Sequence, residues 1–138
     1  MDNKQIVRDF YEKVINAGQL KEVSNYIDPS YVEHSMTPGQ AAVGIEGVGE
    51  HVQFFFKPFS ELKFNLDLVV SESDIVVVRS TMTGVHTGNF LGIEPSGKNV
   101  ETTFIDIFRI KDGKICEHWH EYDLPRLILE IKPGEESI

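Results

Sequence analysis

One aspartate and two histidines in the last third of the chain could transfer protons. Asp106 lies in the segment NVETTFIDIFRI, and His118 and His120 lie in KICEHWHEYD, just after it. A carboxylate beside an imidazole stabilises the imidazolium, whereas apolar walls destabilise it, so such a histidine can titrate near neutral pH. The group could remove a proton from a carbon next to a carbonyl and return it elsewhere. Asp106, His118 and His120 are therefore the candidate catalytic residues.

The turn between these two segments decides whether the three side chains share a face of a sheet. We prefer a three-residue loop over 111–113, with a type I turn and Gly in the left-handed bulge position, because Gly stands third and Asp precedes it. In that register Asp106 faces His118, and His120 lies on the same face. A two-residue turn would instead set Asp106 opposite Trp119 and leave both histidines on the other face.

Cys116 shares the predicted strand face with His118 and His120, and all three are zinc ligand types. Alternate residues of a strand stand about 6.6 Å apart, which is wide for three ligands of one ion. Another side chain, such as that of His86, His34 or Glu33, would have to complete the set of zinc ligands. We therefore expect no metal, and we interpret Cys116 as a small buried hydrophobe.

Six more side chains are candidates for binding a substrate. They are aromatic rings and imidazoles in or beside apolar segments: Tyr11, His34, Phe55, His86, Phe104 and Tyr122. His34 could point into a cavity or be an exposed loop residue, and His86 could stand at a pocket mouth or end a strand. Arg79 and Arg109 lie in apolar strands, where a charge needs an acidic partner such as Asp67, Glu101 or Glu121.

The hydrophobic spacing predicts helices first and strands afterwards. Helical spacing indicates helices over 3–17, over 20–27 and from 48 to about 58, while 31–35 is too short to classify. Alternation then indicates strands over 62–70 and 75–87, a hairpin over 99–123, and a terminal helix over 124–131. This order is typical of the α+β class, with helices packed on one face of a curved sheet.

Length and charge exclude several classes of protein. A chain of 138 residues is expected to form one domain over 1–138. The 22 acidic side chains against 13 Lys and Arg give a net charge of -9, which opposes binding to nucleic acid and to anionic membrane surfaces. A single cysteine and a start without a secretory signal favour the cytoplasm.

The second half of the chain contains an ordered set of motifs. The run GVHTGNFLGIEPSGKNVETTFIDIFRIKDGKICEHWHEYD, from Gly84 to Asp123, has a G-x-H-x-G-x-F-x-G loop, a P-x-G-K turn, a strand ending in FR, a DGKI turn and EHW with a downstream Asp. This set resembles the pattern of the SnoaL-like polyketide cyclases, also called predicted ester cyclases, of the NTF2-like superfamily. Upstream, GIEGVGEHVQFFFKPFSELKF resembles the family's third helix entering the sheet.

The resemblance implies an α+β cone, in which a curved mixed or antiparallel sheet and three N-terminal helices enclose a deep apolar pocket. It also implies a homodimer packed through the outer sheet face. Characterised members are cofactor-free and close a polyketide ring by intramolecular aldol condensation, with a strand Asp as acid/base and a His on the neighbouring strand. The family's Asp commonly follows the Trp, where this chain has His120, and Asp106 takes the neighbouring position. The two residues have thus exchanged places.

Three functions fit these observations. The leading hypothesis is a cofactor-free acid/base enzyme, a cyclase, isomerase or lyase, acting on a small apolar carbonyl compound. The alternative is a non-catalytic module that binds an apolar ligand in the same pocket. The third is a hydrolase or hydratase that activates water with Asp and Arg79 or Arg109. A homodimer is expected because the other hairpin face is apolar, with Thr103, Ile105, Ile107, Ile115 and Trp119.

Overall fold

The computed structural model describes residues 2–35 and 43–132 and confirms the α+β class. The elements follow one another as α1 (Asn3–Asp9), the π-helix η1 (Phe10–Ile15), the 3-10 helix η2 (Leu20–Asn25), β1 (Ile27–Glu33), α2 (Gly44–Phe56), β2 (Phe59–Glu72), β3 (Ile75–His86), β4 (Asn99–Lys111), β5 (Lys114–Tyr122) and α3 (Leu124–Ile131). Among the described residues, none of the helices has the length and hydropathy of a membrane-spanning segment.

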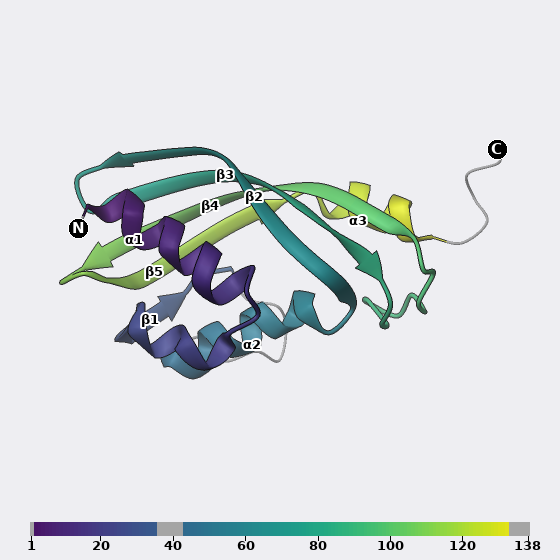
Figure 1. Ribbon diagram of the computed structural model, residues 1–138, viewed down its shortest axis with the longest axis horizontal. Helices are drawn as coiled ribbons and strands as arrows, with labels where there is room; N and C mark the ends of the chain where they lie inside the picture. Colours follow the sequence, from purple (N-terminus) through teal and green to yellow (C-terminus); the bar gives the residue numbers. More distant parts are fainter. Residues whose placement is uncertain (1, 36–42, 133–138) are drawn as a thin grey trace.

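The five strands form one mixed sheet in the order β1-β5-β4-β3-β2. Strands β2 to β5 are long antiparallel neighbours, and β1 runs parallel to β5. The pairing of β2 with β3 shifts twice, once between Ser60 and Lys63 and once between Leu66 and Leu68. Such bulges bend and twist a strand, and Figure 1 shows the resulting curved sheet. The predicted cone-like sheet is confirmed.

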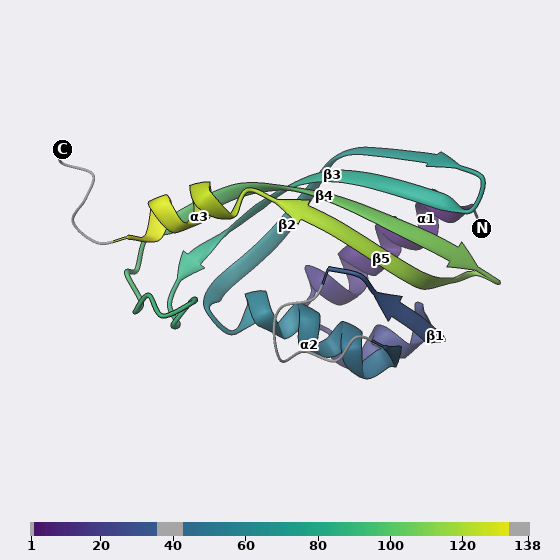
Figure 2. The same cartoon turned by 180° about the vertical axis from the view of Figure 1, so that it is seen from behind.

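The first helices and α2 lie on one side of this sheet, whereas α3 lies at the end opposite the N-terminus (Figures 1 and 2). Helix α1 continues directly into η1, where the backbone changes to wider turns, as in the bond from Asn16 N to the Tyr11 carbonyl. The Asn16 side chain also pairs with the backbone N and O of Phe64, at 2.7 and 2.8 Å. This pair fixes the helical segment on β2.

Several boundaries differ from the predicted ones. The second helix ends at Asn25, because the chain enters β1 at Ile27, before Pro29. The unclassified segment 31–35 contributes the end of β1, which gains its backbone partners from β5, far along the chain. Helix α2 begins at Gly44, four residues earlier than predicted. The terminal helix is confirmed over its predicted range.

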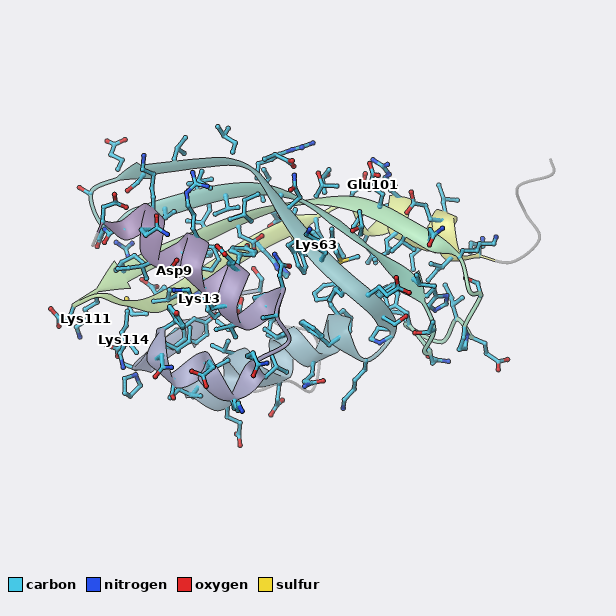
Figure 3. All side chains as sticks on the ribbon, in the orientation of Figure 1. Asp9, Lys13, Lys63, Glu101, Lys111 and Lys114 are labelled. Atoms are coloured by element: carbon cyan, nitrogen blue, oxygen red, sulfur yellow. The ribbon has the colours of Figure 1, made fainter. Side chains whose placement is uncertain are left out.

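The hairpin of β4 and β5 has a different register from the preferred one. Lys111 pairs with Lys114 across a two-residue turn, and the φ angles of Asp112 and Gly113 are +49° and +79°. Both central residues are left-handed, as a type I′ turn requires, and the twist of this turn matches that of the strands. Figure 3 shows Lys111 and Lys114 at the hairpin tip. The predicted three-residue loop is therefore wrong.

A bulge in β5 nevertheless keeps the candidate residues on one face. Ile110 pairs with Ile115 but Arg109 pairs with Glu117, so Cys116 is an extra residue. Beyond this bulge Asp106 pairs with His120. The extra residue restores the alternation that the two-residue turn alone would have inverted.

The two-residue turn also corrects the predicted outer face, because it pairs Ile115 with Ile110, and Ile115 is fully buried on the inner side.

Candidate functional site

An apolar cavity lies between the inner face of the sheet and the helices. It encloses about 580 Å³ of space not occupied by atoms, its open mouth included. Residues from the first helical segment, β1, α2, β2, β4 and β5 line it: Phe10, Tyr11, Ile15, Ile27, Tyr31, Val48, His51, Val52, Phe55, Phe56, Leu62, Phe64, Phe104, Asp106, Phe108, Ile115, His118 and His120. Polar groups are few and converge at one end, an arrangement typical of small-molecule sites.

A row of charged groups forms that polar end. His118 donates from Nε2 to Asp106 Oδ1 at 2.6 Å and from Nδ1 to both oxygens of Glu33, at 2.8 and 3.0 Å. Glu33 also accepts a bond from the hydroxyl of Tyr31. All four side chains are buried. The imidazole of His118 is thus held between two carboxylates from two strands, β1 and β4.

These contacts determine the protonation states of His118, Glu33 and Asp106. Burial alone would lower the pKa of His118, but the hydrogen bonds and charges of Asp106 and Glu33 outweigh it and raise that pKa to about 9. Burial would raise the pKa of Glu33, yet its bonds to His118 and Tyr31 lower it to about 2. The pKa of Asp106 lies far below its usual range, because the hydrogen bond from His118 and the nearby imidazole of His120 outweigh burial. The row is therefore carboxylate, imidazolium, carboxylate.

Two further imidazoles stand beside Asp106. His120 Nδ1 lies 3.6 Å from Asp106 Oδ1, and His51 Nε2 lies 3.4 Å from the same nitrogen of His120. Burial lowers the pKa of His51 to about 4, and neighbouring His120 and His118 add to this effect while Glu33 and Asp106 oppose it. His51 is therefore a neutral imidazole at neutral pH.

Tyrosine and phenylalanine rings form the remaining walls near this cluster. Burial, together with the nearby charge of Asp106, raises the pKa of Tyr11 well above its ordinary value, so Tyr11 keeps its hydroxyl proton. The Phe108 ring stacks on His118 with centroids 4.8 Å apart. Phe55 meets Phe104 edge to face at 5.4 Å. The cluster is thus enclosed by rings that exclude water and strengthen its electrostatic interactions.

The structure brings most of the predicted site residues together. Asp106, His118 and His120 line the cavity, and so do the predicted binding residues Tyr11, Phe55 and Phe104. Tyr122 lies just behind this wall, where its half-buried ring stacks on Phe104 at 4.8 Å.

The side chains of His34 and His86, two predicted binding residues, lie outside the cavity. His34 stacks on Trp119 on the other side of the sheet, 4.7 Å between centroids, and bonds to Glu117 at 2.8 Å. His86 is the last residue of β3 and is fully buried against Phe59, with Nδ1 2.9 Å from the Ser96 hydroxyl. Neither side chain lines the cavity. The expected cavity positions of His34 and His86 are therefore corrected.

The arginines also lie outside the cavity. Arg79 donates to Asp67 at 2.8 Å, as predicted for one of its possible partners. Arg109 donates to Glu117 at 2.6 Å and to Asp74 at 2.9 and 3.0 Å, on the outer face of the hairpin. The hydrolase hypothesis required an arginine beside Asp106, and neither of these arginines supplies one.

Two important residues, Glu33 and His51, were not among the predicted catalytic or binding residues. Glu33 was considered only as an additional metal ligand, and its short strand carries no clear periodic signal. His51 comes from α2, between the buried Val48 and Phe55. Its spacing of three residues from Val48 and four from Phe55 places it on the apolar face of the helix. A histidine on an apolar helix face is the signal that could have found it.

Cys116 differs from its predicted place beside the cluster. It is buried at the bulge but does not line the cavity. Burial raises the pKa of its thiol.

The chain belongs to the SnoaL-like polyketide cyclase family, whose model matches residues 5–131. This membership supports a cyclase-type function.

Three relatives illustrate the similarity. Aklanonic acid methyl ester cyclase AcmA of Streptomyces galilaeus is 29% identical over 110 residues, which are 78% of this chain and 76% of the relative. The structure of TsrD from Streptomyces laurentii matches with a TM-score of 0.84 and 30% identity, covering 97% of this chain and 99% of TsrD. IdmH of Streptomyces antibioticus, a putative polyketide cyclase, matches with a TM-score of 0.80 and 28% identity, covering 91% and 95%.

Proposed function

We propose that the protein is a cofactor-free cyclase that closes a ring in a small, apolar polycarbonyl compound by intramolecular aldol addition. The observation that carries this proposal is an ionised carboxylate, Asp106, held beside an imidazole, His120, at the polar end of an apolar cavity. AcmA, a relative named as an aklanonic acid methyl ester cyclase, supports the same class of reaction.

His120 is the group best suited to take the proton. His118 is already an imidazolium with both ring nitrogens bonded to carboxylates, so it has no free lone pair. Asp106 and His51 have lowered pKa values, which make them weak bases. In this proposal Asp106 stabilises the positive charge that develops on His120, and His118 positions Asp106.

The proposed reaction balances without any co-reactant. His120 removes a proton from a carbon flanked by carbonyls, and the neutral hydroxyl of Tyr11 donates a hydrogen bond to the enolate oxygen. The enolate carbon then attacks a second carbonyl carbon of the same molecule, and the electron pair of that carbonyl moves to its oxygen. The His120 imidazolium returns the proton to this oxygen, which yields a cyclic β-hydroxy ketone of unchanged mass.

The test is a turnover assay on polyketone methyl esters, starting with aklanonic acid methyl ester. We expect a product of unchanged mass, and a loss of turnover of about 10² to 10⁴-fold in His120→Gln and in Asp106→Asn. His34→Gln is the matched control, because its imidazole lies outside the cavity, and it should keep wild-type turnover. Full activity in both cavity variants, or binding of every ester without conversion, contradicts the proposal. A product heavier by one water points to the hydratase alternative.

A further inference from the structure

The imidazole of His51 contacts the proposed base, although the proposed reaction assigns it no role. His51 Nε2 lies 3.4 Å from His120 Nδ1, a long hydrogen bond between two rings whose centroids are 4.6 Å apart. His51 is a buried residue of α2, and both imidazoles line the cavity. The direction of this bond decides which nitrogen of His120 can take a proton.

The charge of Asp106 favours one direction. Asp106 Oδ1 lies 3.6 Å from the same nitrogen of His120, which is too far for a hydrogen bond but close enough for its charge to act. An ionised carboxylate only accepts hydrogen bonds, so it attracts an N–H and repels a lone pair. The proton of a neutral His120 is therefore favoured on Nδ1, from which it is donated to His51 Nε2.

We propose that His51 positions His120 by accepting this hydrogen bond, so that the free lone pair of His120 lies on Nε2. Within the proposed cyclase function, on which this step rests, His120 Nε2 is the atom that removes the proton from the substrate. His51 is a positioning residue in this role, because it acts through His120 and not by contact with the substrate.

The opposite direction fits the site less well. His51 Nε2 would then donate, and His120 would turn a lone pair towards the ionised oxygen of Asp106. Burial lowers the pKa of His51 to about 4, so at neutral pH its ring carries one proton and cannot donate from both nitrogens. His51 Nδ1 is buried without a hydrogen-bond partner among the described residues in either case, so it favours neither direction. The charge of Asp106 distinguishes them.

The surroundings of His120 leave its ring dependent on this contact. The Ser35 hydroxyl bonds to the backbone N and O of His120, at 2.7 and 3.1 Å, which fixes the backbone. The rings of Phe104 and Tyr122 pack edge to face on the imidazole, with centroids 5.7 and 5.4 Å away. Within the described part of the chain, His51 supplies the hydrogen-bond acceptor for the His120 ring.

The first experiment locates the protons in the wild-type chain, so it does not depend on variants that fold. Two-bond ¹H–¹⁵N NMR spectra of the ¹⁵N-labelled full chain distinguish a neutral histidine protonated on Nδ1 from one protonated on Nε2. His51→Gln and His120→Gln assign the signals. We expect both neutral rings to carry the proton on Nδ1. A proton on Nε2 of either ring would overturn the proposal.

The second experiment compares two substitutions of similar size in turnover of aklanonic acid methyl ester. His51→Gln keeps an acceptor oxygen near the place of Nε2, whereas His51→Met does not. His51→Met should lower kcat by roughly 10-fold, less than the 10² to 10⁴-fold expected for loss of the base itself. The acid limb of its kcat profile should move to lower pH, because the His120 imidazolium loses an acceptor. His51→Gln should restore the acid limb and most of kcat.

The other titratable groups around His120 are Asp106, His118 and Tyr122, and both substitutions leave them in place. Equal losses in the two variants, with an unchanged pH profile, would mean that His51 only packs and would overturn the positioning role.

The two proposals fail separately. Absence of turnover in the wild type contradicts the cyclase function, while the NMR spectra still test the proton positions. Turnover in the wild type with an unchanged profile in His51→Met contradicts the positioning role alone.

Discussion

The two faces of the β4–β5 hairpin carry the same arrangement of charges in opposite surroundings. On the inner face, the His118 imidazolium lies between the carboxylates of Glu33 and Asp106. On the outer face, the guanidinium of Arg109 lies between Glu117 and Asp74. The side chains of the inner cation and its two partners are at most 7% exposed, whereas the side chain of Arg109 is 38% exposed.

Burial gives these two networks different consequences. Outside, water screens the charges and the flexible partners lose entropy when they pair, so such networks contribute little to stability. Inside, each charge depends on its neighbours because no water replaces them. Only the inner network also points an ionised oxygen into a cavity. The same arrangement of a cation between two carboxylates can therefore take part in chemistry on the inner face, where the fold excludes water.

The largest expected effect is on stability when the inner cation is removed. His118→Gln leaves Glu33 and Asp106 as two buried carboxylates without their cation. Breaking a buried ion pair in this way costs about 3 to 5 kcal/mol of unfolding free energy. Urea denaturation of the variant and the wild type measures it. A loss no larger than that of an exposed surface pair would contradict the assigned charges.

The pH dependence of stability should follow the same network. The pKa of His118 is raised from 6.5 to about 9, so its contribution is complete below pH 6.5 and is lost as the pH rises through 9. The pKa of Glu33 is lowered from 4.5 to about 2, so its contribution is complete above pH 4.5 and is lost as the pH falls towards 2. The unfolding free energy lost through His118 at alkaline pH, and that lost through Glu33 at acid pH, is about 3 kcal/mol each.

Denaturation midpoints measured from pH 2 to 10 should therefore be highest near pH 6.5. Above it, stability falls as His118 loses its proton, and below it stability falls because His51, whose pKa is lowered from 6.5 to about 4, is protonated more readily in the unfolded chain, with Glu33 adding to the decline below pH 4.5. The other titratable groups facing His118 are Asp106, His51 and His120, with Tyr11 and Tyr31 nearby, and loss of the Asp106 charge steepens the acid side. His118→Gln is the control, because it removes the alkaline decline that His118 causes. An equally steep decline in that variant would assign the effect to another group.

The inner face could be predicted in part from the sequence, because alternation along a strand is a local property. Asp106, His118 and His120 were placed on one face, although the turn was wrong. A type I′ turn and the bulge at Cys116 together preserve the parity that the predicted three-residue loop would have given. Alternation predicts which residues face inwards. It does not reveal the length of the turn when a bulge further along the strand compensates for it.

The remaining partners could not be predicted, because they come from distant elements. Glu33 reaches His118 across 85 positions and His51 reaches His120 across 69. The first contact depends on the parallel pairing of β1 with β5, which no local pattern encodes. The outer position of His34 follows from the same pairing, because His34 N bonds to the carbonyl of His118 just after β1 ends.

Removal of the outer cation should have a much smaller effect than removal of the inner one. Arg109→Gln deletes a cation between two carboxylates, as His118→Gln does, but water can solvate Asp74 and Glu117 afterwards. We expect a loss of unfolding free energy that is a small fraction of the inner one and that fades at high salt. Urea denaturation at low and high ionic strength measures both variants under the same conditions. Equal losses would mean that burial does not distinguish the faces.

The smallest effect concerns what covers the outer face in solution. The homodimer expected from the sequence stays a prediction, and the exposed Leu68, Val70 and Ile105 leave apolar surface for a second copy. If a second copy packs there, Arg109 becomes more buried at high protein concentration, and the Arg109→Gln effect should grow with concentration. Denaturation over a range of protein concentrations, with size-exclusion chromatography, tests this. A monomer at micromolar concentration, with an Arg109→Gln effect that does not change with protein concentration, would contradict the dimer. The contrast between the two faces would then be a property of the single chain.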